Sequence, residues 1–169
     1  QKSGERKNSA SVPGTPLKKE DGAAPTALLS EIRREEYSFD SFISGQKNEL
    51  AVSTIINMLS DLERGVLSYN PLLLRGLPGT GKSHLLHATA ARLRSIPSLA
   101  EQGRIYVLSA SDFAGLFRQS PARREAGRAM LRGCAALCLD DTQQLVRSPQ
   151  AQEELADLID VLIAKKRPV

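Results

Sequence analysis

Long hydrophobic runs are missing from this chain of 169 residues. A membrane-spanning helix needs about 20 consecutive apolar residues, and charged side chains interrupt the apolar stretches well before that length. The sequence therefore predicts no transmembrane segment. The first ten residues are polar and hold no apolar signal region, so nothing there indicates secretion. We expect a cytoplasmic protein.

Cysteine is also scarce, with only Cys134 and Cys138 in the chain. Two cysteines make no disulfide framework. A structural zinc site needs a second Cys or His pair at ligand spacing, and the sequence holds none. Cys138 lies inside an apolar stretch, where a free cysteine behaves as a small core residue.

Aromatic residues make up 4% of the chain and tryptophan is absent. The first 30 or so residues have almost no large apolar side chain and are rich in Gly, Ser, Pro, Ala and Lys. Such a segment buries too little surface to offset the entropy of ordering. We therefore expect residues 1–36 to be a flexible linker or tail. Aromatic residues cluster at 37–42, which predicts one folded domain over 37–169.

The folded part alternates between apolar runs and amphipathic stretches. Glycine or charged residues end each run, a pattern typical of a parallel sheet with helices on both faces. The net charge of +4 is compatible with nucleic-acid binding but does not require it. The expected strands are Pro71–Arg75, Ile105–Leu108 and Ala135–Leu139, and the expected helices are a stretch from about Ala51 to Gly65, Lys82–Arg94, Asp112–Arg118, Pro121–Arg132 and Pro149–Lys165.

One motif carries specific chemistry. Residues 76–83 read GLPGTGKS, follow an apolar run and open an amphipathic stretch. This is the P-loop pattern, in which backbone N–H groups and a helix N-terminus bind phosphate oxygens. The lysine would reach the β- and γ-phosphates of ATP or ADP, and the serine hydroxyl would bind Mg²⁺. The predicted phosphate-binding residues are Gly76, Gly79, Thr80, Gly81, Lys82 and Ser83.

A P-loop needs a carboxylate on a neighbouring strand to hold the metal. Asp140 and Asp141 follow the apolar run 135–139, at the strand end where open α/β sheets bind ligands. Asp140 is the predicted Mg²⁺ residue, and Asp141 is a candidate catalytic residue that orients or deprotonates water. His84 and His87 lie three residues apart with no third ligand nearby, which favours packing over metal binding.

Four further features of the sequence belong together, and they lie at 37–45 with Asn48, at 69–74, in the P-loop through Ala88, and at 139–143. Together these segments resemble the bacterial replication initiator DnaA family. The resemblance implies a P-loop NTPase of the AAA+ type, cut before the later strands and the helical lid. It implies an adenine site along residues 39–48, including Ile43 and Asn48, and ATP-dependent assembly with like subunits on origin DNA.

One departure concerns DNA. Arg124, Arg128 and Arg132 recur every fourth residue and form a basic stripe, which either contacts origin DNA or is an ordinary solvated face. The family's basic run after the acidic strand is replaced here by 148–151, SPQA. The alternative function is therefore an Hda-like regulator, or a helicase-loader-type partner of other replication proteins.

The second departure is at the end of the sequence. The family's sensor residue, arginine finger and lid do not occur before Val169. We therefore do not expect this stretch alone to hydrolyse ATP. The resemblance also places one more strand between Pro71–Arg75 and Ala135–Leu139, and here it could begin only at Arg167. We expect the natural protein to continue beyond Val169.

Overall fold

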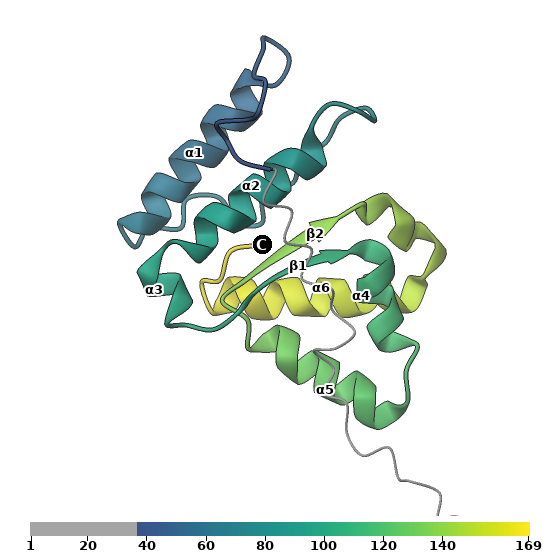
Figure 1. Ribbon diagram of the computed structural model, residues 1–169. Coiled ribbons are helices and arrows are strands. Elements are labelled where there is room, and N and C mark those ends of the chain that lie inside the picture. The colour runs from purple at the N-terminus through teal and green to yellow at the C-terminus, as the bar shows by residue number, and fades with distance from the viewer. Residues whose placement is uncertain (1–36) are drawn as a thin grey trace, which may run out of the picture.

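The computed structural model of the chain describes residues 37–169 as a layered α/β structure (Figure 1). The segment 1–36, expected to be a linker, lies outside the described residues. All five expected helices are present, and two short ones, α3 and η2, were not predicted. The elements are α1 (Glu49–Glu63), α2 (Lys82–Arg94), α3 (Pro97–Ala100), β1 (Ile105–Ser109), α4 (Ala110–Phe117), α5 (Pro121–Arg132), β2 (Ala136–Asp140), the 3-10 helix η2 (Thr142–Arg147) and α6 (Pro149–Ala164).

The two strands pair in parallel, with Ile105 opposite Ala136 and Ser109 opposite Asp140. Successive side chains of a strand point to opposite faces of the sheet, and β2 follows this rule. Ala136 and Cys138 belong to one buried cluster, whereas Leu137 belongs to another. The sheet therefore has two covered faces, as the apolar runs predicted.

Each face of the sheet has its own layer of helices. Figure 1 shows α1 and α2 on one side of the strands, and α4, α5 and α6 on the other. The first cluster joins the strands to α1, α2 and α3, and the second joins them to α4, α5, η2 and α6. The fold expected from the sequence, a parallel sheet between two helical layers, is confirmed.

The predicted strand Pro71–Arg75 is the exception, because it is not a hydrogen-bonded strand. Leu72 and Leu74 still pack against the first cluster, whereas the side chain of Leu73 is 65% exposed. The alternation of apolar side chains is thus typical of a strand, but a strand also needs a series of backbone hydrogen bonds to an adjacent strand. Among the described residues, the backbone of this stretch is bonded to the short segment 167–169, which accepts one hydrogen bond from the Leu72 N–H.

The segment 167–169 lies between this extended stretch and β2. The Leu72 N–H donates to the Val169 carbonyl over 2.9 Å, and the Leu137 N–H donates to the Pro168 carbonyl over 3.0 Å. The Asn70 side chain bonds the same segment through the Arg167 carbonyl (2.7 Å) and the Val169 N–H (2.8 Å). This is the place that the resemblance assigned to an intervening strand.

The cysteines behave as core residues. Both are buried, and burial raises the pKa of Cys138 to about 12 and that of Cys134 to about 11. Their thiols therefore stay protonated at neutral pH. No helix in residues 37–169 is long and apolar enough to cross a membrane.

Candidate nucleotide-binding site

The P-loop has the backbone conformation that its glycines permit. Gly79 and Gly81 have φ angles of +77° and +88°, in the left-handed region that other residues adopt only with strain. Gly81 is the residue immediately before α2, so the loop ends directly at the N-terminus of that helix. Unpaired N–H groups and the positive end of the helix dipole favour an anion there.

The Lys82 side chain folds back over the start of the P-loop. Its ammonium donates to the Gly76 carbonyl over 3.0 Å and to the Leu77 carbonyl over 2.9 Å. The Thr80 hydroxyl donates to the same Leu77 carbonyl over 2.8 Å. Among the described residues Lys82 has no carboxylate partner, so its charge remains available to a bound anion. Ser83 follows in the first turn of α2 and is half-buried.

The two aspartates are held in place at the end of β2. The Asp141 N–H donates to Asp140 Oδ1 over 2.9 Å, and the Gln143 side-chain amide donates to Asp141 Oδ1 over 2.9 Å. Asp141 has a φ of +54° and lies immediately before η2. A left-handed residue other than glycine is uncommon and often lies at functional sites. Asp141 is exposed at this turn.

The start of the P-loop and the two aspartates lie at similar positions along the strand direction of the sheet. Leu72 and Leu137 are bonded to adjacent residues of the segment 167–169. The P-loop starts four residues after Leu72, and Asp140 comes three residues after Leu137. In Figure 1 the start of α2 and the end of β2 lie on the same side of the view. Lys82 and Asp140, which are 58 positions apart in the sequence, thus follow two segments that bond the same short stretch of chain.

The predicted adenine segment, residues 39–48, contacts the P-loop at Phe42. The Phe42 ring lies against Gly81, so closely that a Cβ added to this glycine would come within 2.6 Å of Phe42 Cε2. Ile43 follows and its side chain is 90% exposed. The Asn48 side chain holds the backbone turn of this segment. Its Oδ1 accepts a hydrogen bond from the Gly45 N–H over 2.8 Å, and its Nδ2 donates to the Ile43 carbonyl over 3.3 Å.

His84 and His87 pack against the start of the described chain. His84 Nε2 donates to the Ser38 carbonyl over 2.8 Å, and its ring contacts those of Tyr37 and Phe42. His87 stacks on Tyr37 with ring centroids 5.5 Å apart. In residues 37–169 no group of three or more His, Cys, Asp or Glu side chains could hold a metal ion.

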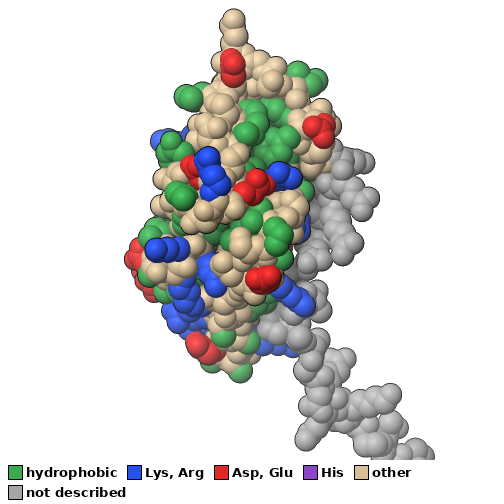
Figure 2. Space-filling view, turned by 90° about the vertical axis from the view of Figure 1, so that its left-hand side faces the viewer, with side chains coloured by type: hydrophobic (Ala, Val, Ile, Leu, Met, Phe, Trp, Pro, Cys, Tyr) green, Lys and Arg blue, Asp and Glu red, His purple; other side chains and the backbone are tan. Residues whose placement is uncertain are grey.

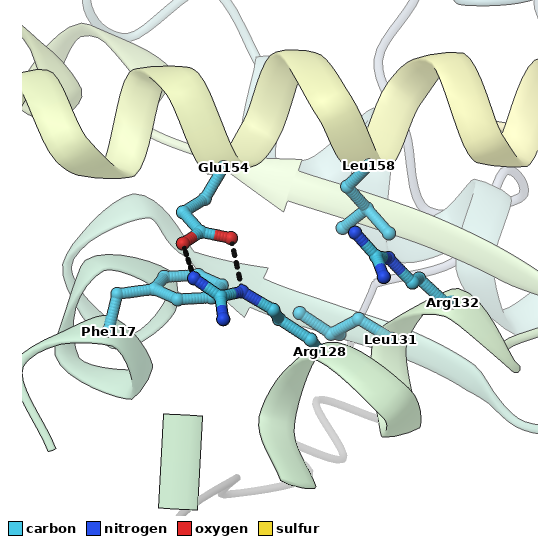
Figure 3. Close-up of a pocket in the computed structure, with 6 residues that line it drawn as sticks. All are labelled: Phe117, Arg128, Leu131, Arg132, Glu154 and Leu158. Carbon is cyan, nitrogen blue, oxygen red and sulfur yellow. Dashed lines mark hydrogen bonds and ion pairs between the residues drawn. The ribbon is translucent and has the colours of Figure 1, made fainter. Parts of the chain in front are cut away.

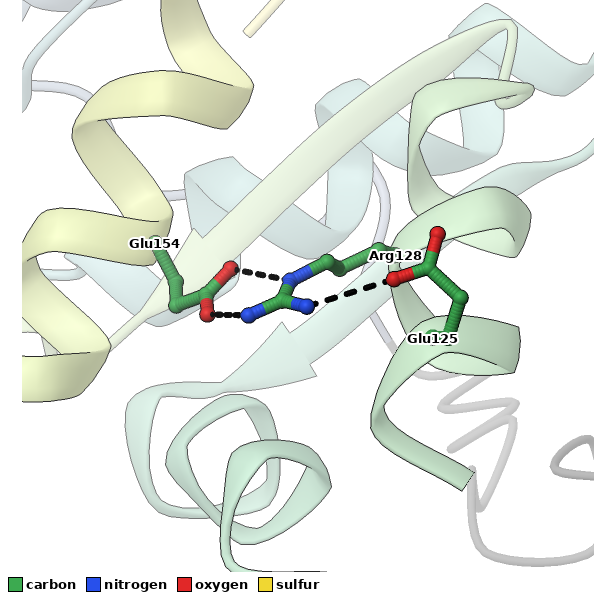
Figure 4. A network of polar contacts seen from close by, with 3 residues as sticks. All are labelled: Glu125, Arg128 and Glu154. Atoms are coloured by element: carbon green, nitrogen blue, oxygen red, sulfur yellow. Dashed lines mark hydrogen bonds and ion pairs between the residues drawn. The ribbon is translucent and has the colours of Figure 1, made fainter. Parts of the chain in front are cut away.

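The arginine stripe on α5 is not a uniformly solvated surface. Arg128 Nε donates to Glu154 Oε2 over 2.8 Å, a second guanidinium nitrogen donates to Glu154 Oε1, and Nη1 donates to Glu125 over 3.2 Å (Figure 4). The Glu154 side chain is only 12% exposed, and that of Arg128 is 32% exposed. Arg128 is therefore paired within the fold, because Glu154 binds its guanidinium in two places, and its contact with DNA stays a prediction.

This ion pair lies in a small hollow between α5 and α6. Figure 3 shows Arg128 and Glu154 reaching toward each other across it, with apolar side chains around them. Arg132 lies at the same hollow, and its charge, like that of Arg124, lowers the pKa of Glu154 further after the hydrogen bonds from Arg128. The hollow is lined by Phe117, Arg128, Leu131, Arg132, Glu154 and Leu158.

We expect Glu154→Gln to lower the melting midpoint by a few degrees at neutral pH, since it leaves a half-buried guanidinium poorly paired. Arg128 holds the pKa of Glu154 below its ordinary value of 4.5. The stabilisation is therefore fully present above pH 4.5 and is lost as the pH falls through the lower, folded-state pKa. Melts from pH 7 to pH 3 should show the parent and Glu154→Gln converging at low pH. The matched control is Glu125→Gln, whose exposed side chain makes one contact, and a larger effect there would contradict this assignment.

The fold and the site define a class. A P-loop that starts a helix on a parallel sheet, with an acid pair at the end of a strand of that sheet, is typical of P-loop NTPases of the α/β class. The family model for the bacterial DnaA ATPase domain matches residues 33–169. The chain belongs to that family.

Individual relatives agree with the family match. The chain is 31% identical to the chromosomal replication initiator protein DnaA of Cereibacter sphaeroides, over 95% of this chain and 37% of the relative. It is also 31% identical to DnaA of Roseobacter denitrificans, over 95% of this chain and 34% of the relative. The chain thus spans little more than a third of the curated relatives it matches.

Solved structures show the same relationship. AMPPCP-bound DnaA from Aquifex aeolicus superposes with a TM-score of 0.67 at 28% identity, covering 79% of this chain and 40% of that one. A replication initiator DnaA bound to AMPPCP and single-stranded DNA superposes with a TM-score of 0.67 at 29% identity and the same coverage. The AAA+ fold predicted from the resemblance is confirmed.

Proposed function

We propose that this chain is the nucleotide-binding part of a DnaA-like replication initiation protein, and that it binds ATP or ADP with Mg²⁺. The observation that carries the proposal is the formed P-loop, in which Lys82 bonds the loop carbonyls while its charge has no carboxylate partner in residues 37–169. A phosphate chain supplies the negative charge that this loop, its lysine and the start of α2 all favour. The relative bound to AMPPCP supports the same ligand.

The residues present also fit a magnesium ion. Mg²⁺ prefers oxygen ligands and usually binds few protein groups besides phosphate and water. Ser83 supplies a hydroxyl at the start of α2, and Asp140 supplies a carboxylate held at one oxygen by the Asp141 N–H. Bound Mg²⁺ neutralises phosphate charge. Asp141, exposed and oriented by Gln143, is the group we propose to position a water molecule or take its proton.

Contact with origin DNA and assembly with like subunits belong to the same proposal. The relative bound to single-stranded DNA supports the DNA contact. Because Glu154 binds Arg128, the DNA-contacting charge of the three stripe arginines would come mainly from Arg124 and Arg132. Figure 2 shows Lys and Arg side chains interspersed with acidic ones on the displayed face. We therefore expect weak binding to oligo-dT that falls steeply with salt, and salt-insensitive binding measured by anisotropy would contradict it.

The metal site gives a direct test of the function. Asp140→Asn should leave ATP binding without Mg²⁺ unchanged, and should remove most of the gain in affinity that Mg²⁺ confers on the parent. The physical reason is that an amide oxygen carries no net charge to share with the cation. Calorimetry with and without a chelator measures both quantities. Gln144→Ala, an exposed change on η2, is the control. An equal magnesium effect in the parent and Asp140→Asn would remove Asp140 from the site.

A further inference from the structure

His84 has contacts with residues outside the phosphate site. It lies in the first turn of α2, two positions after Lys82, and its side chain contacts the segment 37–42. Nε2 is 2.8 Å from the Ser38 carbonyl and 3.4 Å from Ser41 Oγ. A carbonyl can only accept, so Nε2 carries the proton in this contact.

Ring contacts surround the same histidine. Its centroid is 4.8 Å from that of Tyr37, tilted by 55°, and 5.1 Å from that of Phe42, edge to face at 73°. Tyr37 also stacks on His87, one turn further along α2. Aromatic pairs in such geometries contribute favourably beyond the area they bury. His84 therefore links the segment 37–42 to α2 through the hydrogen bond with Ser38 and the ring contacts with Tyr37 and Phe42.

This segment overlaps residues 39–48, where the resemblance implies the adenine site. Phe42 rests on Gly81, the last residue of the P-loop before α2, and the next residue is Ile43, whose side chain is 90% exposed. Asn48 braces the far end of the same turn through Gly45 and Ile43. The stretch 43–48 is thus held between the Phe42–His84 contact on one side and Asn48 on the other.

We propose that His84 is a positioning residue for the nucleobase: it keeps Phe42 and Ile43 beside the P-loop, so that an apolar surface is already in place when the base arrives. This inference rests on the proposed nucleotide site and adds to it a residue that touches neither phosphate nor base. Pre-ordering a segment removes part of the entropy cost of binding. The affinity gained in this way depends on the base and not on the phosphates.

The prediction is that replacing His84 separates base recognition from phosphate recognition. In the full chain, His84→Ala and His84→Leu should lower the affinity for ATP by about tenfold, the equivalent of one hydrogen bond and its packing. Their affinity for inorganic tripolyphosphate, which has no base, should stay within twofold of the parent. His84→Gln retains an N–H donor and should recover part of the ATP affinity. Calorimetry with both ligands and Mg²⁺ measures this.

The controls distinguish the possible failures. Arg94→Ala, an exposed change at the far end of α2, should leave both affinities unchanged. A parallel loss of ATP and tripolyphosphate affinity, or no loss in any variant, would overturn the role of His84 while leaving the phosphate site intact. A parent that binds neither ligand would overturn the proposed function itself. Should His84→Ala fail to fold by circular dichroism, His84→Leu and His84→Gln carry the comparison, because both preserve side-chain volume better.

Discussion

Replacing Lys82 by alanine should reduce the affinity of this chain for ATP and ADP by at least about a hundredfold, because hydrogen bonds to charged groups contribute about 1.5–3 kcal/mol each and the lysine would reach two phosphates. The fold should survive. Lys82 bonds only the carbonyls of its own loop, so its removal creates no cavity in either core cluster.

Calorimetric titration of ATP and ADP measures the loss, and a melt of the same sample checks the fold. Arg94→Ala is the matched control, since it removes a positive charge from the other end of α2. Equal nucleotide affinities in Lys82→Ala and the parent would refute the phosphate site.

Gly81→Ala should impair the protein in two ways. At a φ of +88° any side chain is strained, at a cost of about 1–2 kcal/mol. The new Cβ would also meet the Phe42 ring at 2.6 Å, so the ring must shift from its place beside the P-loop and His84. We therefore expect a larger loss of stability than strain alone explains, together with a loss of ATP affinity of about a hundredfold or more, since the donors of the loop and the base segment move together.

Gly79→Ala separates these two causes. Gly79 has a φ of +77° but no neighbour within 4 Å of an added Cβ, so its substitution carries the strain without the collision. Chemical denaturation of both variants measures the difference in the free energy of unfolding. If Gly81→Ala were no less stable than Gly79→Ala, the close contact between Phe42 and Gly81 would be disproved.

Local patterns in the chain were sufficient for much of this structure. The P-loop could be recognised because its function depends on eight consecutive residues whose backbone forms the site. The helices could be recognised from apolar spacing, and the two faces of β2 from alternation of side chains. The position of Asp140 and Asp141 at the end of a strand could be predicted because an apolar run precedes them, and their roles at the site stay a prediction.

Pro71–Arg75 shows where local patterns are insufficient. Its alternation is that of a strand, and Leu72 and Leu74 are packed accordingly. Yet a strand is defined by bonds to a neighbouring chain, and among the described residues only 167–169 reaches it. The stripe of arginines on α5 is a similar case. Its helical spacing was correct, but spacing does not reveal which side chain meets a carboxylate from another helix.

By itself the sequence determined the α/β layering, the phosphate loop and the acid pair, since each depends on residues that are neighbours in the chain or repeat at a fixed period. Only the tertiary structure decided that Arg128 is bound by Glu154, 26 positions away, and that His84 holds Ser38, 46 positions away. Such contacts depend on how helices pack across the sheet and beside the loop. Packing is set by the whole set of buried side chains, and no short stretch of sequence contains it.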